Sequence, residues 1–310
     1  MDFTTKLSKD KGTPLFDIAS YRRLVGKLLY LTTTRHDLSF ATHQLSQFLS
    51  APTDLHEKAL HRVLRYIKAS PGQVDGVLNI MRSCLKAKTI RRFIYTSTAG
   101  TVAIQPPPPL PEYDESFWTD VDFCYAEKMP GWSYLVAKTK AEKAAWEFAK
   151  ENGINLVTVH LSLVVGPFLT FKAFQYRLRI GFDHNIIGNI VGNEALYKMI
   201  ATGQAVHLED ACSAHIFLFE HPEANGRYIC SNHSFTIVDL AKALSQKYPE
   251  YNVPTKFESI DESLKAISCS SKKLLDLGFT FKFESTKYDV GDLYAEAFEF
   301  CREKGIMPQP

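Results

Sequence analysis

The feature that most constrains this 310-residue chain is a change of pattern at Ser70-Pro71-Gly72-Gln73. Before this point apolar residues recur at helical spacing, and after it short apolar runs alternate with helical segments. Because alternating helices and strands bury a parallel sheet between helices, the later part predicts an α/β fold. We expect residues 1–73 to form a short all-helical segment and residues 74–310 to fold separately.

The early part predicts three amphipathic helices between residues 17 and 70. Asp17, Asp37 and Thr53 stand where N-caps are expected. Residues 1–73 carry 11 Lys/Arg against 6 Asp/Glu, but neither an aromatic stacking pattern nor a nucleic-acid motif accompanies this surplus. We interpret the surplus as solvated helix faces and expect no nucleic-acid partner.

The later part predicts an incomplete, Rossmann-like, doubly wound parallel sheet. A helix near residues 77–85 leads to the apolar run at residues 93–95, which is typical of a buried parallel strand. A long helix over residues 133–152 leads to two further strands, at residues 156–161 and 163–165. We expect the core to extend to residue 166.

The region over residues 167–310 predicts a smaller C-terminal domain with a late helix at residues 290–304. Two stretches lack a clear period. Residues 106–109 are four consecutive prolines, which require an extended surface loop. Residues 170–191 fit either an ordinary loop or an insertion, including one that arises from an incorrect gene model.

Composition and targeting patterns indicate a cytoplasmic protein. The chain opens on a polar stretch, and no run of 18 apolar residues occurs, so we expect no signal peptide and no membrane association. The six cysteines show no CxxC pairing and no histidine at zinc-ligand spacing, which predicts free thiols and no metal site.

Candidate chemistry centres on Tyr134 and Lys138, which stand four residues apart in a helical segment and therefore share one face. A neighbouring cation lowers the pKa of a phenol towards the working pH of an enzyme, which suits a proton donor in carbonyl reduction. Ser97 and Thr98 follow the strand at residues 93–95, at the sheet end where ligands bind, so a hydroxyl there can contact a carbonyl. The spacing alone also fits a surface pair without a role.

Three features follow one another in the sequence: a cluster of hydroxyl residues, a helix with the Tyr-x-x-x-Lys spacing, and a strand that ends in Gly-Pro. The sequence around them resembles the extended short-chain dehydrogenases/reductases, specifically the plant dihydroflavonol 4-reductase group. The similarity covers most of residues 74–310. The matching segments are VDGVLNIMRSCLKAKTIRRFIYTSTAGTV, YDESFWTD, GWSYLVAKTKAEKAAWEFAKENGI, LVVGPF, GNEALY, VHLEDACSAHIFLFEHPEANGRYICS, KYPEYNVPTKF, SSKKLLDLGF and CREKGIMP.

This resemblance implies an NADPH-dependent oxidoreductase that reduces a ketone on a flavonoid or a related phenylpropanoid. Tyr134 would then be the general acid and would contact the cofactor, together with Lys138, which would bind the nicotinamide ribose. Thr98 matches the usual catalytic serine, and Ser97 precedes it beside the cofactor. Substrate-contacting positions of the family fall on Ala103, where an asparagine or similar residue is usual, and on Gln204.

One expected part of such a protein is missing from the sequence. The family opens with a strand, a Gly-x-x-Gly-x-x-Gly turn and a helix whose N-terminus holds the pyrophosphate. The 16 glycines of this chain include no pair two or three residues apart. We therefore interpret residues 74–166 as the remaining part of an NAD(P)-binding domain. An inactive chimeric reductase without cofactor binding is the alternative hypothesis, and the missing turn favours it.

In place of the missing part, residues 6–73 resemble the copia-type retrotransposon polyprotein, in the stretch between the polymerase core and the ribonuclease H domain. The aspartates of the polymerase site and the carboxylates of ribonuclease H are not in this stretch, so reverse transcription is not implied. The sequence leaves the ketone substrate and the oligomeric state open.

Overall fold

The computed structural model describes residues 7–8, 11–32, 38–69, 73–129, 131–167, 201–257, 260–261 and 263–303. The chain divides into two compact units, Met1–Arg82 and Ser83–Pro310. The division falls within helix α4 (Gln73–Ala87), a few residues after the predicted junction at residue 73. The irregular stretch at residues 170–191 lies outside the described residues.

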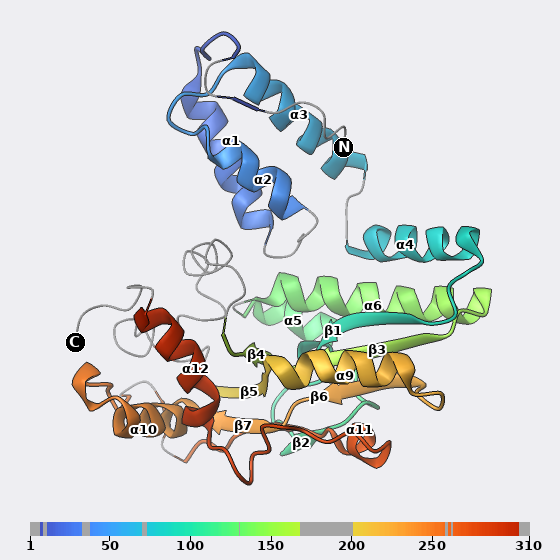
Figure 1. The fold of residues 1–310 in the computed structure, drawn as a ribbon, viewed down its shortest axis with the longest axis vertical. Helices are drawn as coiled ribbons and strands as arrows, with labels where there is room; N and C mark the ends of the chain where they lie inside the picture. Colours follow the sequence, from blue (N-terminus) through green and yellow to red (C-terminus); the bar gives the residue numbers. More distant parts are fainter. Residues whose placement is uncertain are drawn as a thin grey trace. The chain divides into compact units, whose positions relative to one another are not determined.

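The N-terminal unit contains three helices ahead of α4, as the periodicity predicts: α1 (Ile18–Leu31), α2 (Ser39–Ser46) and α3 (Asp54–Ala69) (Figure 1). Asp17 is confirmed as the N-cap of α1, because its carboxylate accepts a hydrogen bond from the Ser20 amide. Leu38 precedes α2 without a side-chain cap, and the predicted cap Asp37 lies outside the described residues. Thr53 precedes α3, but its hydroxyl donates to the Lys11 carbonyl.

An aliphatic cluster forms the interior of this unit. Its apolar side chains lie at helical spacing, so one stripe of each helix faces the common core. The Tyr21 hydroxyl donates to the Leu45 carbonyl at 2.9 Å, which satisfies the polar end of a buried ring. The fully enclosed members are Tyr21, Val25, Leu28, Leu38, Leu45, Leu60 and Val63.

The second unit is α/β. Its elements in chain order after α4 are β1 (Phe93–Thr98), a 3₁₀ turn η2 (Ala99–Thr101), β2 (Glu112–Tyr113), α5 (Val121–Glu127), α6 (Trp132–Asn152), β3 (Leu156–Leu161), β4 (Leu163–Val165), β5 (Thr202–His207), α9 (Leu208–Glu220), β6 (Gly226–Cys230), β7 (His233–Thr236), α10 (Ile237–Lys247), η4 (Pro249–Tyr251), β8 (Ser268–Cys269), α11 (Lys272–Asp276) and α12 (Val290–Glu303).

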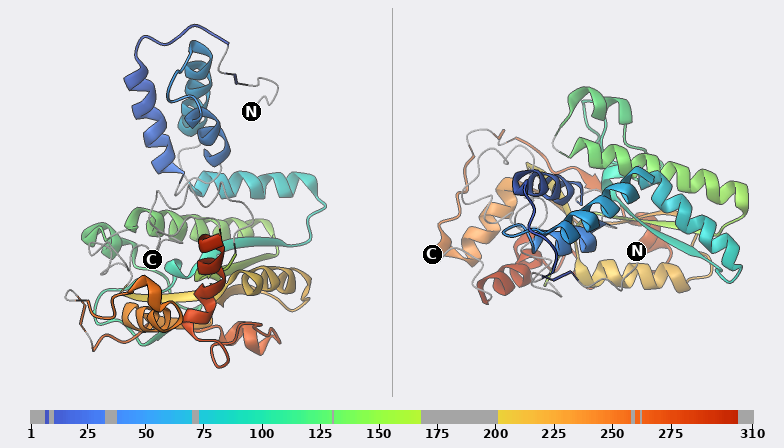
Figure 2. Two further views of the ribbon diagram at one scale, coloured as in Figure 1. Left: turned by 60° about the vertical axis from the view of Figure 1, so that its left-hand side comes forward. Right: turned by 90° about the horizontal axis from the view of Figure 1, so that it is seen from above.

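A parallel sheet in the order β1-β3-β6 forms the centre of this unit, with α6 on one face and α9 on the other (Figures 1 and 2). Successive side chains of β3 point to opposite faces of the sheet, so one set faces α9 and the other faces α6. Val157 and Val159 join the apolar cluster that α9 covers, whereas His160 points towards α6, where Glu142 lies. The predicted Rossmann-like sheet is thereby confirmed in its α/β class and its parallel direction.

A second small sheet, in the order β4-β5-β7, begins the C-terminal part. β4 runs parallel to β5, and β7 runs antiparallel to β5. Helices α10 and α12 pack on each other and on this sheet over an apolar cluster that includes Phe235, Leu244 and Phe298. The two strands predicted at residues 156–161 and 163–165 therefore belong to different sheets, although one residue separates them.

One sequence expectation changes in detail, and another is confirmed. β1 continues to Thr98 instead of ending at Tyr95, so the hydroxyl residues belong to the strand and alternate between its faces. The proline run at residues 106–109 is fully exposed, as expected for a surface loop. None of the helices in the described ranges is long and apolar enough to cross a membrane.

Candidate active site

The C-terminal end of β1 distributes its hydroxyl groups over three environments. Thr96 faces α9, where its hydroxyl lies 2.9 Å from His215 Nε2. Ser97 faces α6 and is buried. Thr98 ends the strand and caps η2, because its Oγ1 accepts a hydrogen bond from the Gly100 amide at 3.3 Å. Only one hydroxyl of the run therefore stands at the strand end, where ligands bind in α/β sheets.

Helix α6 brings Tyr134 to this strand end. A Cβ at position 100 would lie 2.5 Å from Leu135 Cδ2, so the first turn of α6 packs closely against the turn that follows Thr98. A side chain at position 100 would therefore have to displace the end of the Leu135 side chain. Tyr134 precedes Leu135 and is half-buried, which places the predicted proton donor on the helix turn that abuts η2.

Lys138 lies between two phenol rings. Its Nζ is 6.0 Å from the centroid of the Tyr134 ring and 5.7 Å from that of Tyr95. Nζ also lies 3.5 Å from the Thr96 carbonyl oxygen, which ties the ammonium to β1. Burial lowers the pKa of the Lys138 ammonium, and the charge of Glu142 opposes this effect. The predicted pair of Tyr134 and Lys138 thus lies together near the carboxyl end of β1.

Below this pair, Glu142 forms a buried polar cluster that the sequence interpretation did not identify. The carboxylate has no exposed surface and accepts four hydrogen bonds. Ser97 and Thr101 donate to Oε2 at 2.5 and 2.8 Å. His160 Nε2 and Arg227 Nε donate to Oε1 at 2.7 and 2.8 Å.

These contacts govern the ionisation of Glu142. Burial by itself would raise the pKa of Glu142, because it disfavours the charged form. The hydrogen bond and charge of His160, the charge of Arg227 and the hydrogen bond from Ser97 outweigh burial and lower the pKa to about 2. Glu142 is therefore a permanent buried anion at neutral pH.

Arg227 extends the cluster to the loop before α5. Its Nη1 donates to the carbonyl oxygens of Glu115 and Phe117, both at 2.6 Å. The guanidinium carbon lies 3.8 Å from the centroid of the Trp118 ring, in a cation–π contact. The next residue along, Thr119, donates its hydroxyl to the Gly100 carbonyl at 2.7 Å, so this loop also restrains the turn after Thr98.

One sequence signal could have identified Glu142. Tyr134, Lys138 and Glu142 stand at successive intervals of four, so they share one helix face. A carboxylate on a face that packs against a strand requires partners, but which partners it has depends on distant residues. Ser97, predicted beside the cofactor, has its hydroxyl engaged with Glu142 instead.

The predicted substrate-contacting residues lie on either side of residue 267. Ala103 packs with Ile267 against the cluster around Val102 and Tyr113. Gln204 belongs to β5, and its side-chain amide donates to the Ile267 carbonyl at 2.8 Å. This hydrogen bond fixes the amide of Gln204.

The described residues fit only one end of a dinucleotide. Tyr134 and Lys138 suit a nicotinamide ribose, which offers hydroxyls to an ammonium. A pyrophosphate, however, needs open backbone amides at a strand-to-helix turn. Within the described ranges, the β5–α9 and β7–α10 turns lack glycine, and the amides there are capped by His207 and by Thr236 with Asp239. The part of the chain described thus offers no pyrophosphate cradle.

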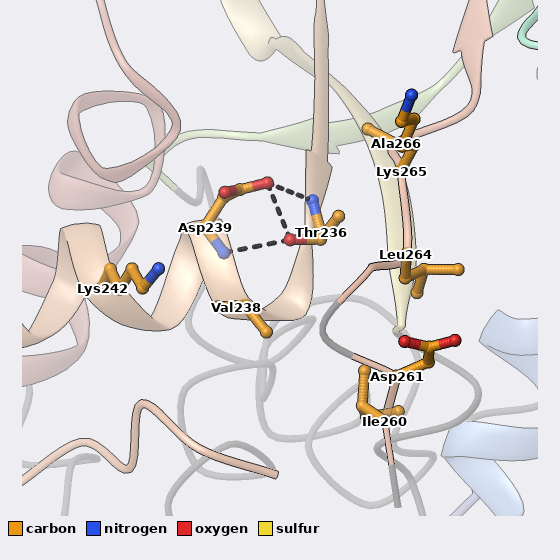
Figure 3. A pocket seen from close by; sticks show the side chains of 9 residues that line it. All are labelled: Thr236, Val238, Asp239, Lys242, Ile260, Asp261, Leu264, Lys265 and Ala266. Carbon is orange, nitrogen blue, oxygen red and sulfur yellow. Dashed lines mark hydrogen bonds between the residues drawn. The ribbon is translucent and has the colours of Figure 1, made fainter.

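Two surface hollows lie away from these residues. One, of about 270 Å³, lies between α10 and residues 260–266, where Asp239 is already engaged in the capping box with Thr236 (Figure 3). The other, of about 1020 Å³, is lined by Arg92 and Leu156, at the amino ends of the strands. Ligands of α/β sheets bind at the opposite, carboxyl ends. Neither hollow contains a predicted site residue.

Metal and disulfide chemistry find no support in the described ranges. They contain no group of three or more His, Cys, Asp or Glu side chains placed to hold a metal ion. The cysteines whose side chains are described are free thiols, as the sequence predicts: Cys84, Cys124, Cys212, Cys230 and Cys269.

A parallel sheet between helices, with Tyr134 and Lys138 together near its carboxyl end, defines a Rossmann-like α/β protein. The chain belongs to the NAD dependent epimerase/dehydratase family, whose profile matches residues 67–231. It is 48% identical over 237 residues to the bifunctional dihydroflavonol 4-reductase/flavanone 4-reductase of Malus domestica, and 51% identical over 235 residues to the dihydroflavonol 4-reductase of Callistephus chinensis. Each alignment covers 76% of this chain.

The chain spans only part of the length of these relatives: the alignments cover 65% of the Malus protein and 61% of the Callistephus protein. Among solved structures, vestitone reductase from alfalfa is 36% identical with a TM-score of 0.64, over 76% of this chain and 72% of that one. The yeast reductase Gre2, solved with NADPH, shares the fold at 21% identity and a TM-score of 0.59, over 76% of this chain and 71% of Gre2.

Proposed function

We propose that residues 83–310 carry the carbonyl-binding and proton-donating half of a dihydroflavonol 4-reductase-type oxidoreductase. The observation that supports this proposal most strongly is the packing of the Tyr134 turn of α6 against the turn after Thr98, with Lys138 beside both. In this proposal Tyr134 supplies the proton to the carbonyl oxygen of a ketone. Thr98 donates a hydrogen bond to the same oxygen, and Lys138 favours the phenolate of Tyr134.

The substrate class of the proposal is a flavonoid or related phenylpropanoid ketone, with Ala103 and Gln204 near the ring system. The names of the relatives and of the alfalfa reductase support this class. NADPH is the proposed cofactor of the complete reaction, Lys138 and Tyr134 are its proposed ribose contacts, and the cytoplasm is the proposed compartment. Ser97 serves this site through Glu142 instead of through the cofactor.

An inactive chimera is the second candidate, and the glycine-free strand-to-helix turns of the described ranges favour it for the chain by itself. In this reading residues 1–73 derive from a copia-type retrotransposon polyprotein and stand where relatives have a nucleotide-binding part. Supplying such a part tests whether residues 83–310 keep a working half of the site, because only an intact half could then reduce a ketone.

The deciding experiment replaces residues 1–73 with the dinucleotide-binding half of a related dihydroflavonol 4-reductase. We expect NADPH-dependent reduction of a dihydroflavonol in this graft. Tyr134→Phe in the graft removes the proton donor and keeps the ring, so kcat should fall by roughly 10²-fold or more while NADPH affinity is retained. A graft that folds, binds NADPH and reduces no ketone would contradict the proposal.

A matching measurement on the unaltered chain tests the cofactor argument. Titration calorimetry of the 310-residue protein with NADPH should show no saturable binding, because the described turns leave no amides for a pyrophosphate. Binding in the micromolar range would show that another part of the chain supplies the cradle.

A further inference from the structure

Glu142 lies one helical turn beyond Lys138 and two turns beyond Tyr134, on the same face of α6. Tyr134 and Lys138 are half-buried, whereas Glu142 is completely enclosed. The helix that carries the candidate proton donor therefore also carries a buried carboxylate, whose hydrogen-bond donors come from β1, η2, β3 and β6.

The two donors to Oε2 flank the candidate carbonyl-binding residue. Ser97 precedes Thr98 in the strand, and Thr101 closes the turn that Thr98 begins. The Thr101 hydroxyl lies 2.8 Å from Glu142 Oε2 and 2.9 Å from the Thr98 carbonyl oxygen, so it links the carboxylate to the backbone of Thr98 itself. Moving Glu142 would release both ends of this five-residue segment, Ser97 and Thr101.

We infer that Glu142 is a positioning residue for the proposed carbonyl reduction, which holds the Thr98 turn in register with Tyr134 and Lys138 on the helix. The inference rests on the proposed function, because it assigns Glu142 to the geometry of that reaction. The hydrogen bonds of Glu142 go to the strand and the turn around Thr98 and to β3 and β6. Its effect is transmitted through Ser97, Thr101 and the charge that it places below Lys138.

The charge of Glu142 also affects the ionisation of the two phenols near Lys138 differently. Tyr95 on β1 and Tyr134 on α6 both lie near Lys138, at 5.7 and 6.0 Å from its Nζ to their ring centroids. Burial, followed by the Glu142 carboxylate, raises the pKa of Tyr95. The same carboxylate favours the charged form of Lys138. Glu142 thus partly offsets the effect of burial on the Lys138 ammonium and adds to the effect of burial on Tyr95, so it favours Tyr134 over Tyr95 as the phenol that Lys138 activates.

The test uses the 310-residue chain with Glu142→Gln and two spectroscopic readouts that need neither cofactor nor substrate. Amide exchange of Gly100, Val102 and Ala103 should become on the order of 10-fold faster, because the turn loses its tether. The side-chain resonance of Lys138, assigned with Lys138→Arg, should titrate at a lower pH. Glu142→Asp keeps the charge, so it should restore the titration of Lys138 in large part.

Two controls separate positioning from general loss of stability. Val159→Ala creates a cavity in β3 and leaves the carboxylate in place, so it should destabilise the sheet without a selective change at residues 100–103 or at Lys138. Glu151→Gln removes an exposed carboxylate of the same helix and should change neither readout. If Glu142→Gln does not fold, Ser97→Ala removes a single tether and should still accelerate exchange at Gly100.

The inference would be overturned if amide exchange at residues 100–103 were unchanged in Glu142→Gln, or if Val159→Ala changed it as much as Glu142→Gln does. The proposed function would then still be tested by the graft experiment. Conversely, an inactive graft combined with selective changes in Glu142→Gln would contradict the proposed function alone. The two ideas are therefore tested by separate measurements.

Discussion

The interiors of the two units differ in kind. The helical unit encloses an apolar cluster with one tyrosine, whose hydroxyl is satisfied by a backbone carbonyl, and the other buried polar side chains among its described residues are Thr32, Thr42, Thr53 and His56. The α/β unit encloses a carboxylate together with an imidazole, a guanidinium and two hydroxyls. Apolar periodicity accounts for the first interior. The second costs desolvation of several charges, which a protein could avoid with apolar residues of similar volume.

This difference indicates which interior has a role besides stabilising the fold. Replacing buried ion pairs by apolar residues is often neutral or stabilising, so the Glu142 cluster is poorly explained by stability alone. Its position directly behind the Thr98 turn and the Tyr–Lys pair supplies the other explanation. Breaking each interior in turn therefore tests whether the comparison is correct.

The largest expected effect comes from Arg227→Met in the α/β unit. Removing the guanidinium leaves the Glu142 charge short of a partner, so the free energy of unfolding should fall by about 3–5 kcal/mol. All three tryptophans belong to this unit, so urea unfolding followed by tryptophan fluorescence reports on it. Arg302→Met, which breaks an exposed pair with Glu299, is the control and should change stability by less than about 1 kcal/mol.

Acid should remove the stabilisation contributed by Glu142. The pKa of Glu142 is lowered to about 2 from its ordinary value of 4.5. The contribution is complete above pH 4.5 and is lost as pH falls towards 2, with a total on the order of 3 kcal/mol. The difference in unfolding free energy between the wild-type chain and Glu142→Gln should shrink across this window. A difference that stays constant from pH 6 to pH 3 would contradict the assignment of a buried anion.

A smaller effect is expected in the helical unit from Leu45→Ala. Deleting this enclosed side chain should cost about 2 kcal/mol, at the lower end for such changes because a small unit relaxes around the cavity. Circular dichroism should report an earlier loss of helix, while the tryptophan fluorescence transition stays in place. A shift of both transitions together would show that the two interiors unfold as one.

The smallest effect is expected from Tyr21→Phe, which removes the hydroxyl of the tyrosine in the apolar cluster of the helical unit. The Leu45 carbonyl loses its side-chain donor, so the helical unit should lose about 1 kcal/mol of stability. Circular dichroism at increasing temperature measures this loss. Equal stability of the two proteins would mean that water replaces the hydroxyl, and that this interior is wetter than its aliphatic lining indicates.

The sequence predicted those parts of the fold that depend on local periodicity. The helices of the first unit, the strand at residues 156–161 and helix α6 follow their apolar patterns within a residue or two. Asp17 was identifiable as a cap because capping is a contact with the adjacent turn. The extension of β1 to Thr98 was missed, because threonine and serine at a strand end are equally typical of a turn.

The candidate site was predictable only in its local half. Tyr134 and Lys138 could be paired because four residues of helix separate them. Glu142 shares their face, but its importance depends on His160 and Arg227, which reach it from strands 18 and 85 residues away. No spacing rule connects such positions, since the order of strands in the sheet brings them together.

These separations have a consequence for how the protein is made. A chain that emerges from the ribosome exposes Glu142 long before Arg227, and β6 must be synthesised before the carboxylate gains its guanidinium partner. Contacts between residues this far apart close slowly, because the intervening chain must first be ordered. The central sheet therefore completes its interior late, and any product that ends before residue 227 lacks the guanidinium partner of the Glu142 carboxylate.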